Sequence, residues 1–497
     1  MDHRLKEERC KKVARLRELG VDPYGHRFPD VNPISDVRRS GESLDIQPGQ
    51  IIEGQRYRVA GRIMLQRVMG NLVFLTVQDG TGRLQIGLSK GALKDVWPVI
   101  KLLDLGDIVG VDGGLGRTKT GELTVWADGL TLLAKSLQPP PEKWHGLTDV
   151  EIRYRRRYVD LFTNPQVREV FKQRSAIIQA IRDYLIGLDY VEVETPVLQP
   201  IYGGAAARPF TTHHNTLDMK LYLRISPELY HKRLLVGGID RVFEFSRNFR
   251  NEGISTQHNP EFTLLELYEA YADYHVMMER VERMTAAAIE RIGGGLKRTF
   301  NGRELDFSPP WPRRKYAELF HEYAGVPMTD VGLVWAKAAE VGIDPAGMAD
   351  AVVVNKLFEE KVEPHLVQPV FVCDYPADIC ALTKRDPADP SLALRFEAFV
   401  SGMEIGNAYT ELNDPQVQRA NFERTVAGEG DETMAVMDED FLTALEYGMP
   451  PAGGLGVGID RLVMLLTDSP SIRDVILFPL QKPRRGHEAG EDQAADV

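Results

Sequence analysis

Long apolar runs and cysteines are what this sequence of 497 residues has least of. It contains no stretch of about 18 apolar residues, and its start, Met-Asp-His-Arg-Leu-Lys, forms no apolar signal region, so we expect neither a membrane span nor secretion. The three cysteines, Cys10, Cys373 and Cys380, make no Cys-x-x-Cys pair and no zinc spacing, which favours free thiols. Free thiols are typical of a reducing compartment, so the sequence predicts a cytoplasmic protein.

A phosphate-binding Gly-Lys-[Ser/Thr] loop is also absent, which excludes a P-loop nucleotide site. The formal net charge of −12 argues against a surface that is basic throughout, but it leaves local basic patches open. Residues 4–19 are one such patch, since their spacing predicts a helix rich in Lys and Arg that ends at Gly20. A solvated helix face and a contact with RNA both fit this pattern.

The length allows two or three domains, and residues 55–138 have the pattern of an all-β domain. Short apolar runs alternate there with glycine-containing turns, and five such strands predict a small closed barrel. We expect the strands at Tyr57–Leu65, Leu72–Asp79, Arg83–Leu88, Asp107–Asp112 and Glu122–Leu133. The stiff segment Gln138-Pro-Pro-Pro141 follows them and predicts a linker.

The most informative stretch is Arg241–Tyr268, which predicts two antiparallel strands joined by a long loop. Arg250 and Glu252 lie where the first strand ends. There an arginine can bind a phosphate through its fork of N–H groups, and a glutamate can accept a hydrogen bond from an exocyclic amine. A salt-bridged hairpin is the alternative for Arg250 alone. The combination with His258 and Phe262 favours a binding site.

A second stretch, Arg395–Asp414, predicts a hairpin around a turn at Ser401-Gly402. Pairing across that turn sets Phe399 opposite Glu404 and Glu397 opposite Gly406, which puts the two glutamates on one face, about 7–8 Å apart. Two carboxylates so placed can hold Mg²⁺ against ATP phosphates, although two solvated glutamates are the alternative.

Three further residues of this hairpin have the opposite parity along the strand: Asn407, Tyr409 and Glu411. They can face the same cavity as Glu404 if the strand contains a bulge, for which Gly406 is the natural position. A regular ladder would place one of the two sets outside the cavity.

A third stretch, Gly453–Leu466, passes from a glycine-rich strand into an apolar helix with Arg461 in its first turn. Together the three stretches resemble the class II aminoacyl-tRNA synthetases. The sequence Arg-Asn-Phe-Arg-Asn-Glu-Gly followed by His-Asn-Pro-Glu-Phe resembles their motif 2, and Gly-x-Gly-x-Asp-Arg resembles motif 3. A helix at 167–187 and a strand at 190–196, ended by Pro196, resemble motif 1. The lysine, aspartate and asparagine branch is most similar, and within it the lysyl-tRNA synthetases, over nearly the whole chain.

This resemblance implies an α+β fold with an N-terminal OB-fold barrel and a class II catalytic domain, in which helices flank an antiparallel sheet. It also implies a homodimer through motif 1 around Pro196. We find no chemistry in residues 270–395, which predict helices at 274–292, 314–324, 333–341 and 351–362. The expected domains are a basic helix and linker at 1–54, an anticodon-binding barrel at 55–138, a linker at 139–165, a catalytic domain at 166–483 with a helical insertion at about 272–395, and a disordered tail at 484–497.

The activity implied is the activation of L-lysine with ATP and its transfer to the 3′ end of tRNA(Lys). By resemblance, Arg250 and Arg461 are the catalytic residues. The ATP-binding residues implied are Arg250 on the α-phosphate, Arg461 and His258 on the distal phosphates, Glu252 on the adenine amine, Phe262 stacked on the ring, Asn259, and Glu397. Glu397 and Glu404 are implied as ligands of Mg²⁺.

The choice of amino acid follows from the charges at the matching positions. A lysine ammonium needs buried anionic acceptors, whereas aspartate needs cations. The implied lysine-binding residues are Gly204, Glu228, Glu266, Tyr268, Asn407, Tyr409 and Glu411. These positions hold three acids and no Lys or Arg, which favours lysine.

For the anticodon, the resemblance points to Arg67, Phe74, Gln85 and Glu122 on the barrel. Phe74 can stack on a base, an interaction of about 1–3 kcal/mol, and a core phenylalanine is the alternative. A relative that lysylates elongation factor P lacks the barrel, so the barrel and Gly456 favour tRNA. A non-catalytic paralogue predicts loss of Arg250, Glu397, Glu404 or Arg461, and all four are present.

Overall fold

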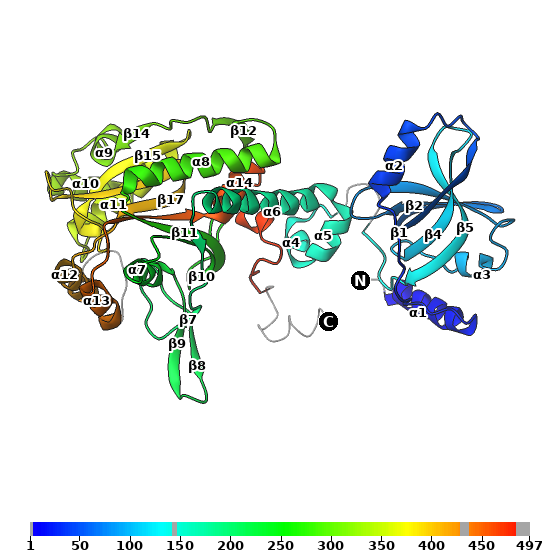
Figure 1. The fold of residues 1–497 in the computed structure, drawn as a ribbon, viewed down its shortest axis with the longest axis horizontal. Helices are drawn as coiled ribbons and strands as arrows, with labels where there is room; N and C mark the ends of the chain where they lie inside the picture. The colour runs from blue at the N-terminus through cyan, green and yellow to red at the C-terminus, as the bar shows by residue number, and fades with distance from the viewer. Residues whose placement is uncertain (1–2, 142–146, 428–436, 484–497) are drawn as a thin grey trace. The chain divides into compact units, whose positions relative to one another are not determined.

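The computed structural model describes residues 3–141, 147–427 and 437–483 (Figure 1). The chain divides into two compact units, Met1–Thr148 and Asp149–Val497. The tail predicted to be disordered, residues 484–497, lies outside the described residues. Within the described ranges, no helix combines the length and the apolar character that a membrane crossing requires.

The first unit is built on a closed barrel, as the sequence predicts. Its longest strand pairs on one edge with β2 and on the other with β4, which closes the sheet. Along β2, Val73, Leu75 and Val77 fill the interior while the residues between them face outward. In spatial order the strands are β1 (Ile51–Met69), β2 (Leu72–Gln78), β3 (Arg83–Ser89), β5 (Leu123–Ala134) and β4 (Ile108–Arg117).

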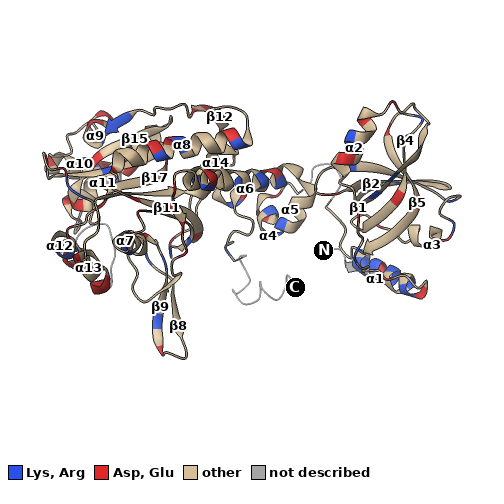
Figure 2. Ribbon diagram, viewed as in Figure 1, with Lys and Arg blue, Asp and Glu red and all other residues tan. Residues whose placement is uncertain are grey.

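The predicted N-terminal helix is α1 (His3–Glu18), and its basic residues stand out in Figure 2. Two of these basic residues already bind partners within the first unit. Arg9 donates to the carbonyl oxygens of Leu105 and Ser136, and Lys12 Nζ lies 2.5 Å from Asp104. The RNA interpretation therefore rests on the other basic residues of this helix. The same unit contains α2 (Ile34–Ser43) and the short α3 (Trp97–Ile100).

The second unit is organised around an eight-stranded sheet. Neighbouring strands are antiparallel except at the two edges, where β14 runs parallel to β15 and β6 runs parallel to β10. The strand order is β14 (Arg313–Lys315), β15 (Val370–Pro376), β16 (Leu392–Val400), β17 (Met403–Thr410), β18 (Ala452–Gly458), β11 (Glu261–Ala270), β10 (Arg241–Phe249) and β6 (Val191–Glu192).

Helices that share the largest apolar core with this sheet include α6 (Pro165–Ile186), α8 (Tyr274–Ile292), α14 (Ile459–Leu466) and the short α15 (Ile472–Val475). In Figure 1, α6 and α8 extend along one face of the sheet. Met277, Val281 and Ala288 of α8 repeat at helical spacing and are buried in that core.

Three of the predicted helices correspond to α9 (Tyr316–Ala324), α10 (Val331–Glu340) and α11 (Asp350–Lys361). By contrast, the strand predicted at 190–196 is regular only at the two residues of β6. Beyond them, the Val193 N–H donates to the carbonyl of Phe243 at 2.9 Å, and the Thr195 hydroxyl donates to Glu244 at 2.7 Å. The remaining elements are α4 (Val150–Arg155), α5 (Arg157–Thr163), β7 (Leu198–Gln199), β8 (Thr211–His214), β9 (Met219–Leu223), α7 (Glu228–Val236), β12 (Lys297–Phe300), β13 (Arg303–Asp306), η1 (Glu363–His365), η2 (Ala377–Ile379), α12 (Pro415–Val426) and α13 (Glu439–Glu446).

The predicted strand–loop–strand of motif 2 is confirmed as β10 and β11, which form a regular antiparallel ladder. The strand β10 ends at Phe249, so Arg250 opens the loop, and its N–H donates to the carbonyl of Pro260 at 2.9 Å. Glu266 and Tyr268 lie two residues apart on β11 and therefore share one face.

The hairpin β16–β17 corrects one predicted pair. Phe399 does lie opposite Glu404, but Glu397 pairs with Asn407 and not with Gly406, which pairs with Ala398. The register shifts because Ile405 is an extra residue between the two pairs, so the predicted bulge exists beside Gly406. This bulge brings side chains of both parities to one face.

Candidate active site

A cavity of about 450 Å³ lies over the central strands of the sheet. Glu411 does not line the cavity. Its Oε1 lies against Gly454, which does line the cavity. The other residues predicted for ATP, lysine and metal binding all line this cavity: Gly204, Glu228, Arg250, Glu252, His258, Asn259, Phe262, Glu266, Tyr268, Glu397, Glu404, Asn407, Tyr409 and Arg461. We call Arg250 and Arg461, with the adjoining neutral ring of His258, the cationic set, and Glu228, Glu266 and Glu411 the acidic set.

Arg250 is the least satisfied member of the cationic set. Its Nε is buried and has no hydrogen-bond partner among the described residues, while its guanidinium lies 5.1 Å from the ring centre of Phe262. Burial lowers the pKa of Arg250, against the opposing field of Glu404. Burying a cation without a partner is costly, so this guanidinium is arranged to receive an anion such as a phosphate or a carboxylate.

Arg461 and His258 form the rest of the cationic set. Arg461 lies in the first turn of α14 and donates to the carbonyl of Glu404 at 2.6 Å, and its Nη2 lies 3.0 Å from His258 Nε2. The other ring nitrogen of His258 lies 2.9 Å from Ser255 Oγ. Burial, and then repulsion from Arg461, lower the pKa of His258, so the ring is neutral near pH 7.

Two residues predicted to contact adenine, Glu252 and Phe262, lie near the motif 2 loop with Asn259, which was predicted to bind ATP. Glu252 is exposed at the cavity wall, and Phe262 is half-buried opposite Asn248 on β10. The buried Asn259 donates from Nδ2 to the carbonyl of Glu261 at 2.7 Å, while its Oδ1 has no partner in the described ranges. The structure thus brings an aromatic ring, a carboxylate and a free amide oxygen to one cavity.

Glu397 and Glu404, the residues predicted to bind metal, both line the cavity. The hydroxyl of Tyr375 donates to Glu397 Oε2 at 2.8 Å, and Arg395 holds the other oxygen. Burial raises the pKa of Glu397 against the effect of Arg395, and repulsion from Glu404 adds to that rise.

No cluster of three or more His, Cys, Asp or Glu suited to a metal occurs in the described part of the chain. Mg²⁺ in nucleotide sites, however, takes only one or two carboxylates together with phosphates. The mutual repulsion of Glu397 and Glu404 would be relieved by such an ion, so this pair fits Mg²⁺ that arrives with a nucleotide.

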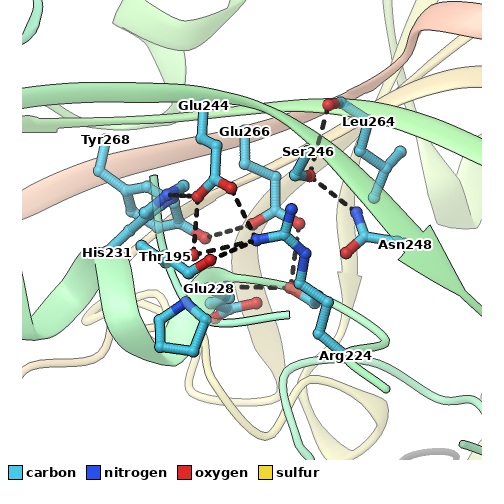
Figure 3. Close-up of polar contacts among 12 residues, drawn as sticks. Thr195, Arg224, Glu228, His231, Glu244, Ser246, Asn248, Leu264, Glu266 and Tyr268 are labelled. Atoms are coloured by element: carbon cyan, nitrogen blue, oxygen red, sulfur yellow. Dashed lines mark hydrogen bonds and ion pairs between the residues drawn. The ribbon is translucent and has the colours of Figure 1, made fainter. Parts of the chain in front are cut away.

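In the acidic set, Glu266 is buried on β11 and receives two hydroxyl groups (Figure 3). Ser226 Oγ donates at 2.9 Å and the Tyr268 hydroxyl at 3.3 Å. Burial, and then repulsion from Glu228, raise the pKa of Glu266 to about 8. A cationic ligand would lower this pKa again, since it favours the ionised carboxylate.

The sequence predicts three acids in the lysine pocket without a Lys or Arg among them. In the structure, Lys232 lies between two of these acids. Its Nζ is 2.8 Å from Glu228 Oε1 and 2.6 Å from Glu411 Oε2, and its side chain is fully buried. Burial opposes a charged Lys232, yet Glu228 and Glu411 together raise its pKa. A Cβ at Gly454 would lie 2.0 Å from Glu411 Oε1, so this glycine keeps space for the carboxylate.

The remaining residues predicted for lysine binding complete the wall. Asn407 donates from Nδ2 to the Tyr409 hydroxyl at 2.9 Å and accepts from Arg395 Nε at 3.1 Å. Gly204 has a φ of +84°, and a Cβ there would meet Glu228 at 3.1 Å. Glycine at this position therefore lets the backbone adopt the left-handed region and approach the acidic set closely.

A buried network supports the acidic set from α7 and β10 (Figure 3). Glu244 pairs with Arg224 at 2.6 Å, accepts from Thr195, and lies 3.1 Å from the ring of His231. Burial lowers the pKa of His231 despite Glu244, so the ring stays neutral. Because the charges of Glu244 and Arg224 cancel, this network adds no net charge to the cavity.

Sequence reasoning missed several residues of the site. Residues 270–395 were expected to hold no chemistry, but the cavity is lined from this region by Asn355 and Glu359 of α11, Ile379 and Arg395, and Tyr375 orients Glu397. Lys232 was missed as well, although it stands four residues after Glu228 on a helix, a spacing that places both on one face.

The residues predicted for the anticodon lie on the first unit. Arg67 donates from Nη2 to Gln85 Oε1 at 2.6 Å, and Gln85 in turn donates to Thr124. Phe74 is half-buried, lies 5.9 Å from the ring of Trp126, and is outside the barrel core, which rejects the alternative of a core phenylalanine. Glu122 is exposed just before β5.

Comparisons with known proteins agree over both units. The family of class II tRNA synthetases (D, K and N) matches residues 149–482, and the OB-fold nucleic acid binding domain matches residues 57–133. The chain is 50% identical over 487 residues to a lysine–tRNA ligase of Carboxydothermus hydrogenoformans, covering 97% of this chain and 98% of that protein. It is 52% identical over 495 residues to the lysine–tRNA ligase of Pelotomaculum thermopropionicum, covering 97% and 95%. For the lysine–tRNA ligase of Nostoc punctiforme, identity is 48% over 503 residues, covering 96% and 88%. The chain therefore belongs to the class II tRNA synthetases (D, K and N), and within them to the lysine–tRNA ligase family.

Proposed function

We propose that this protein activates L-lysine with ATP, forming lysyl-adenylate and pyrophosphate, and then transfers lysine to the 3′ end of tRNA(Lys). The observation that carries the proposal is that one cavity contains both an arginine that can bind an anion and carboxyl groups that can bind a cation. Arg250 is a half-buried cation whose Nε lacks a partner among the described residues, and the acidic set next to it has three carboxyl groups beside a single ammonium, that of Lys232. The phosphates of ATP and the carboxylate of lysine can bind Arg250, and the ammonium groups of lysine can bind the acidic set.

In the first step, the lysine carboxylate attacks the α-phosphorus of ATP and pyrophosphate leaves. The site contributes positioning and charge neutralisation, because the reaction requires no covalent help from the protein. Arg250 binds the α-phosphate, while Arg461 and His258 bind the distal phosphates. Glu252 accepts from the adenine amine, Phe262 stacks on the adenine ring, and Asn259 closes the ATP pocket.

Glu397 and Glu404 would hold Mg²⁺, which neutralises phosphate charge when it is bound with ATP. Arg395 and Tyr375 keep Glu397 in place for this role. At the other substrate, Glu228, Glu266 and Glu411 receive the two ammonium groups of lysine. Tyr268, Asn407, Tyr409 and the backbone at Gly204 complete that pocket.

In the second step, a hydroxyl of the terminal adenosine of tRNA attacks the activated carbonyl, and AMP leaves. Arg67, Phe74, Gln85 and Glu122 read the anticodon on the barrel, with stacking on Phe74. The enzyme acts as a homodimer through the segment around Pro196, in the cytoplasm, where ATP and tRNA are available. Exposed Val191, Val197 and Leu198 beside that segment support an interface there.

Amino-acid-dependent exchange between ATP and pyrophosphate, measured with all twenty amino acids and without tRNA, tests this proposal. Exchange with lysine alone is expected. Exchange with aspartate or asparagine would overturn the assignment of the acidic set, and no exchange by folded enzyme would overturn the activity. Charging of tRNA(Lys) compared with elongation factor P then decides the acceptor, and tRNA is expected.

A further inference from the structure

Lys232 is a fully buried cation inside the proposed amino-acid pocket, and the mechanism above gives it no role. It extends from α7, and besides Glu228 and Glu411 its Nζ has the carbonyl of Leu382 at 3.5 Å. A buried charge of this kind is costly unless it is paired. A methionine or leucine would fill similar space without that cost, so packing alone does not explain the ammonium.

The ion pair of Lys232 reaches Glu411 at Oε2, 2.6 Å away. Neither oxygen of this carboxylate has a hydrogen-bond partner in the described part of the chain, so Oε1 is free to receive a ligand. That free oxygen lies against Gly454, a residue of the cavity wall. Lys232 therefore fixes Glu411 by one oxygen and directs the other toward the cavity.

The charges of the pocket can be counted around this ion pair. The acidic set carries three negative charges when ionised, and Lys232 reduces the total to two. Lysine carries two ammonium groups, so the pocket and the ligand balance, while Arg250 remains for the carboxylate. An amino acid with an uncharged side chain would leave one buried negative charge without a partner, which disfavours its binding.

We propose that Lys232 is a specificity-determining positioning residue, which holds Glu411 and Glu228 in place and sets the charge of the pocket to match an amino acid with two ammonium groups. This inference rests on the proposed lysine activation. Lys232 touches neither the reacting atoms nor ATP, and it acts through the two glutamates.

The ionisation of Glu411 gives this role a distinct signature. Burial and repulsion from Glu228 raise the pKa of Glu411 to about 8, against the lowering effect of Lys232. Removing Lys232 raises this pKa further, so Glu411 loses its charge over a wider pH range and binds the ligand ammonium less well. The ionisable groups that act on Glu411 are Lys232 and Glu228 on α7, and Tyr268 on β11 faces it as well. Tyr268 in turn faces Glu266 on β11 and Tyr409 on β17.

The test is lysine-dependent exchange by K232M and K232R between pH 6.5 and 9. For K232M at pH 7 we expect KM for lysine to rise at least about tenfold, with kcat and KM for ATP nearly unchanged, because a charged hydrogen-bonded contact is weakened. The dependence of kcat/KM on pH should move to higher pH, and selectivity for lysine over norleucine, which lacks the side-chain amine, should fall. K232R retains the charge, so its pH profile should stay closer to that of the wild type.

Arg233→Met is the matched control, since it removes a cation from the same helix that pairs with Asp438 and Asp440 and not with the acidic set. A K232M enzyme with wild-type KM, pH profile and selectivity would overturn the role of Lys232 while leaving the proposed function intact. Equal effects in R233M and K232M would overturn it too, because a general weakening of α7 would then suffice. If K232M fails to fold, K232R decides: a shifted pH profile despite the retained charge overturns the proposal, and an unshifted profile supports it. A wild-type enzyme without lysine-dependent exchange would overturn both proposals together.

Discussion

The cationic and acidic sets share one cavity but treat buried charge differently. In the cationic set, Arg250 is half-buried, and its buried Nε has no hydrogen-bond partner among the described residues. In the acidic set, Glu411 already has Lys232 at 2.6 Å and Glu266 already has two hydroxyl donors. A lone cation can stay charged because arginine loses its proton only with great difficulty. Three buried acids would protonate instead, so they need partners that keep them partly ionised.

The largest effect is expected from removing the guanidinium of Arg250, whose Nε has no hydrogen-bond partner among the described residues. Arg250→Ala is expected to lower kcat for lysine-dependent exchange by about 100-fold to 1000-fold, the usual cost of losing one preorganised donor to developing charge. The melting temperature should change little, because few protein contacts are lost. Arg247→Ala is the control, since Arg247 is exposed and pairs with Glu261 at 3.4 Å. Equal losses in the two variants would contradict the role of Arg250.

A second change tests the acidic set sterically, without altering charge. In Gly454→Ala the new methyl group would lie 2.0 Å from Glu411 Oε1 and 2.5 Å from the Tyr268 ring. Both side chains must then move, and a displacement of about 1 Å at such a site costs about 100-fold. We expect KM for lysine to rise by that factor while KM for ATP stays unchanged. A parallel rise in both constants would show that the two sets are not separate.

The buried carboxyl group of Glu266 makes the stability of the protein depend on pH. The pKa of Glu266 is raised to about 8, above its usual value, so its stabilising contribution is complete at acidic pH and is lost as the pH rises toward about 8. Glu266→Gln should remove this loss, and its stability relative to the wild type should increase by about 2–3 kcal/mol between pH 6 and pH 9. Thermal unfolding of both proteins at the two pH values, with the exposed E252Q as control, measures it. Identical pH dependence in E266Q and the wild type would disprove the assignment.

The smallest effect is expected from removing the neutral hydrogen bond between Asn407 and Tyr409. Tyr409→Phe removes the hydroxyl that accepts from Asn407 and keeps the aromatic wall. A neutral hydrogen bond contributes about 1 kcal/mol, so KM for lysine should rise about fivefold. Steady-state exchange kinetics measure this change. A rise above that of G454A would mean that Tyr409 contacts lysine through its hydroxyl.

The fold and most of the cavity could be predicted from the sequence because their signals are local. The alternation of apolar and polar residues and the turn residues predict the two antiparallel strands β10 and β11, and the sequence of motif 2 identifies Arg250 and Glu252. The barrel followed from the same alternation, and Phe74 fell on its outer face.

The remaining errors concern contacts that no local pattern encodes. Glu397 was paired with Gly406 because the position of an extra residue in a hairpin depends on the strands on both sides of it. Lys232 escaped notice because its partner Glu411 is far away in the sequence, and a lysine on a helix is usually solvated. Asn355 and Glu359 reach the cavity from a helix whose sequence shows only ordinary amphipathic spacing.

The extra residue at Ile405 has a consequence for how this enzyme can change over evolutionary time. It allows one strand to present Glu404, Asn407 and Tyr409 to the same cavity, although Glu404 has the opposite parity to the other two. Deleting a single residue there would turn one of these groups away from the cavity. Under the proposed function, one backbone position therefore links ATP binding to amino-acid recognition, so insertions and deletions in this hairpin should be purged even where substitutions are tolerated.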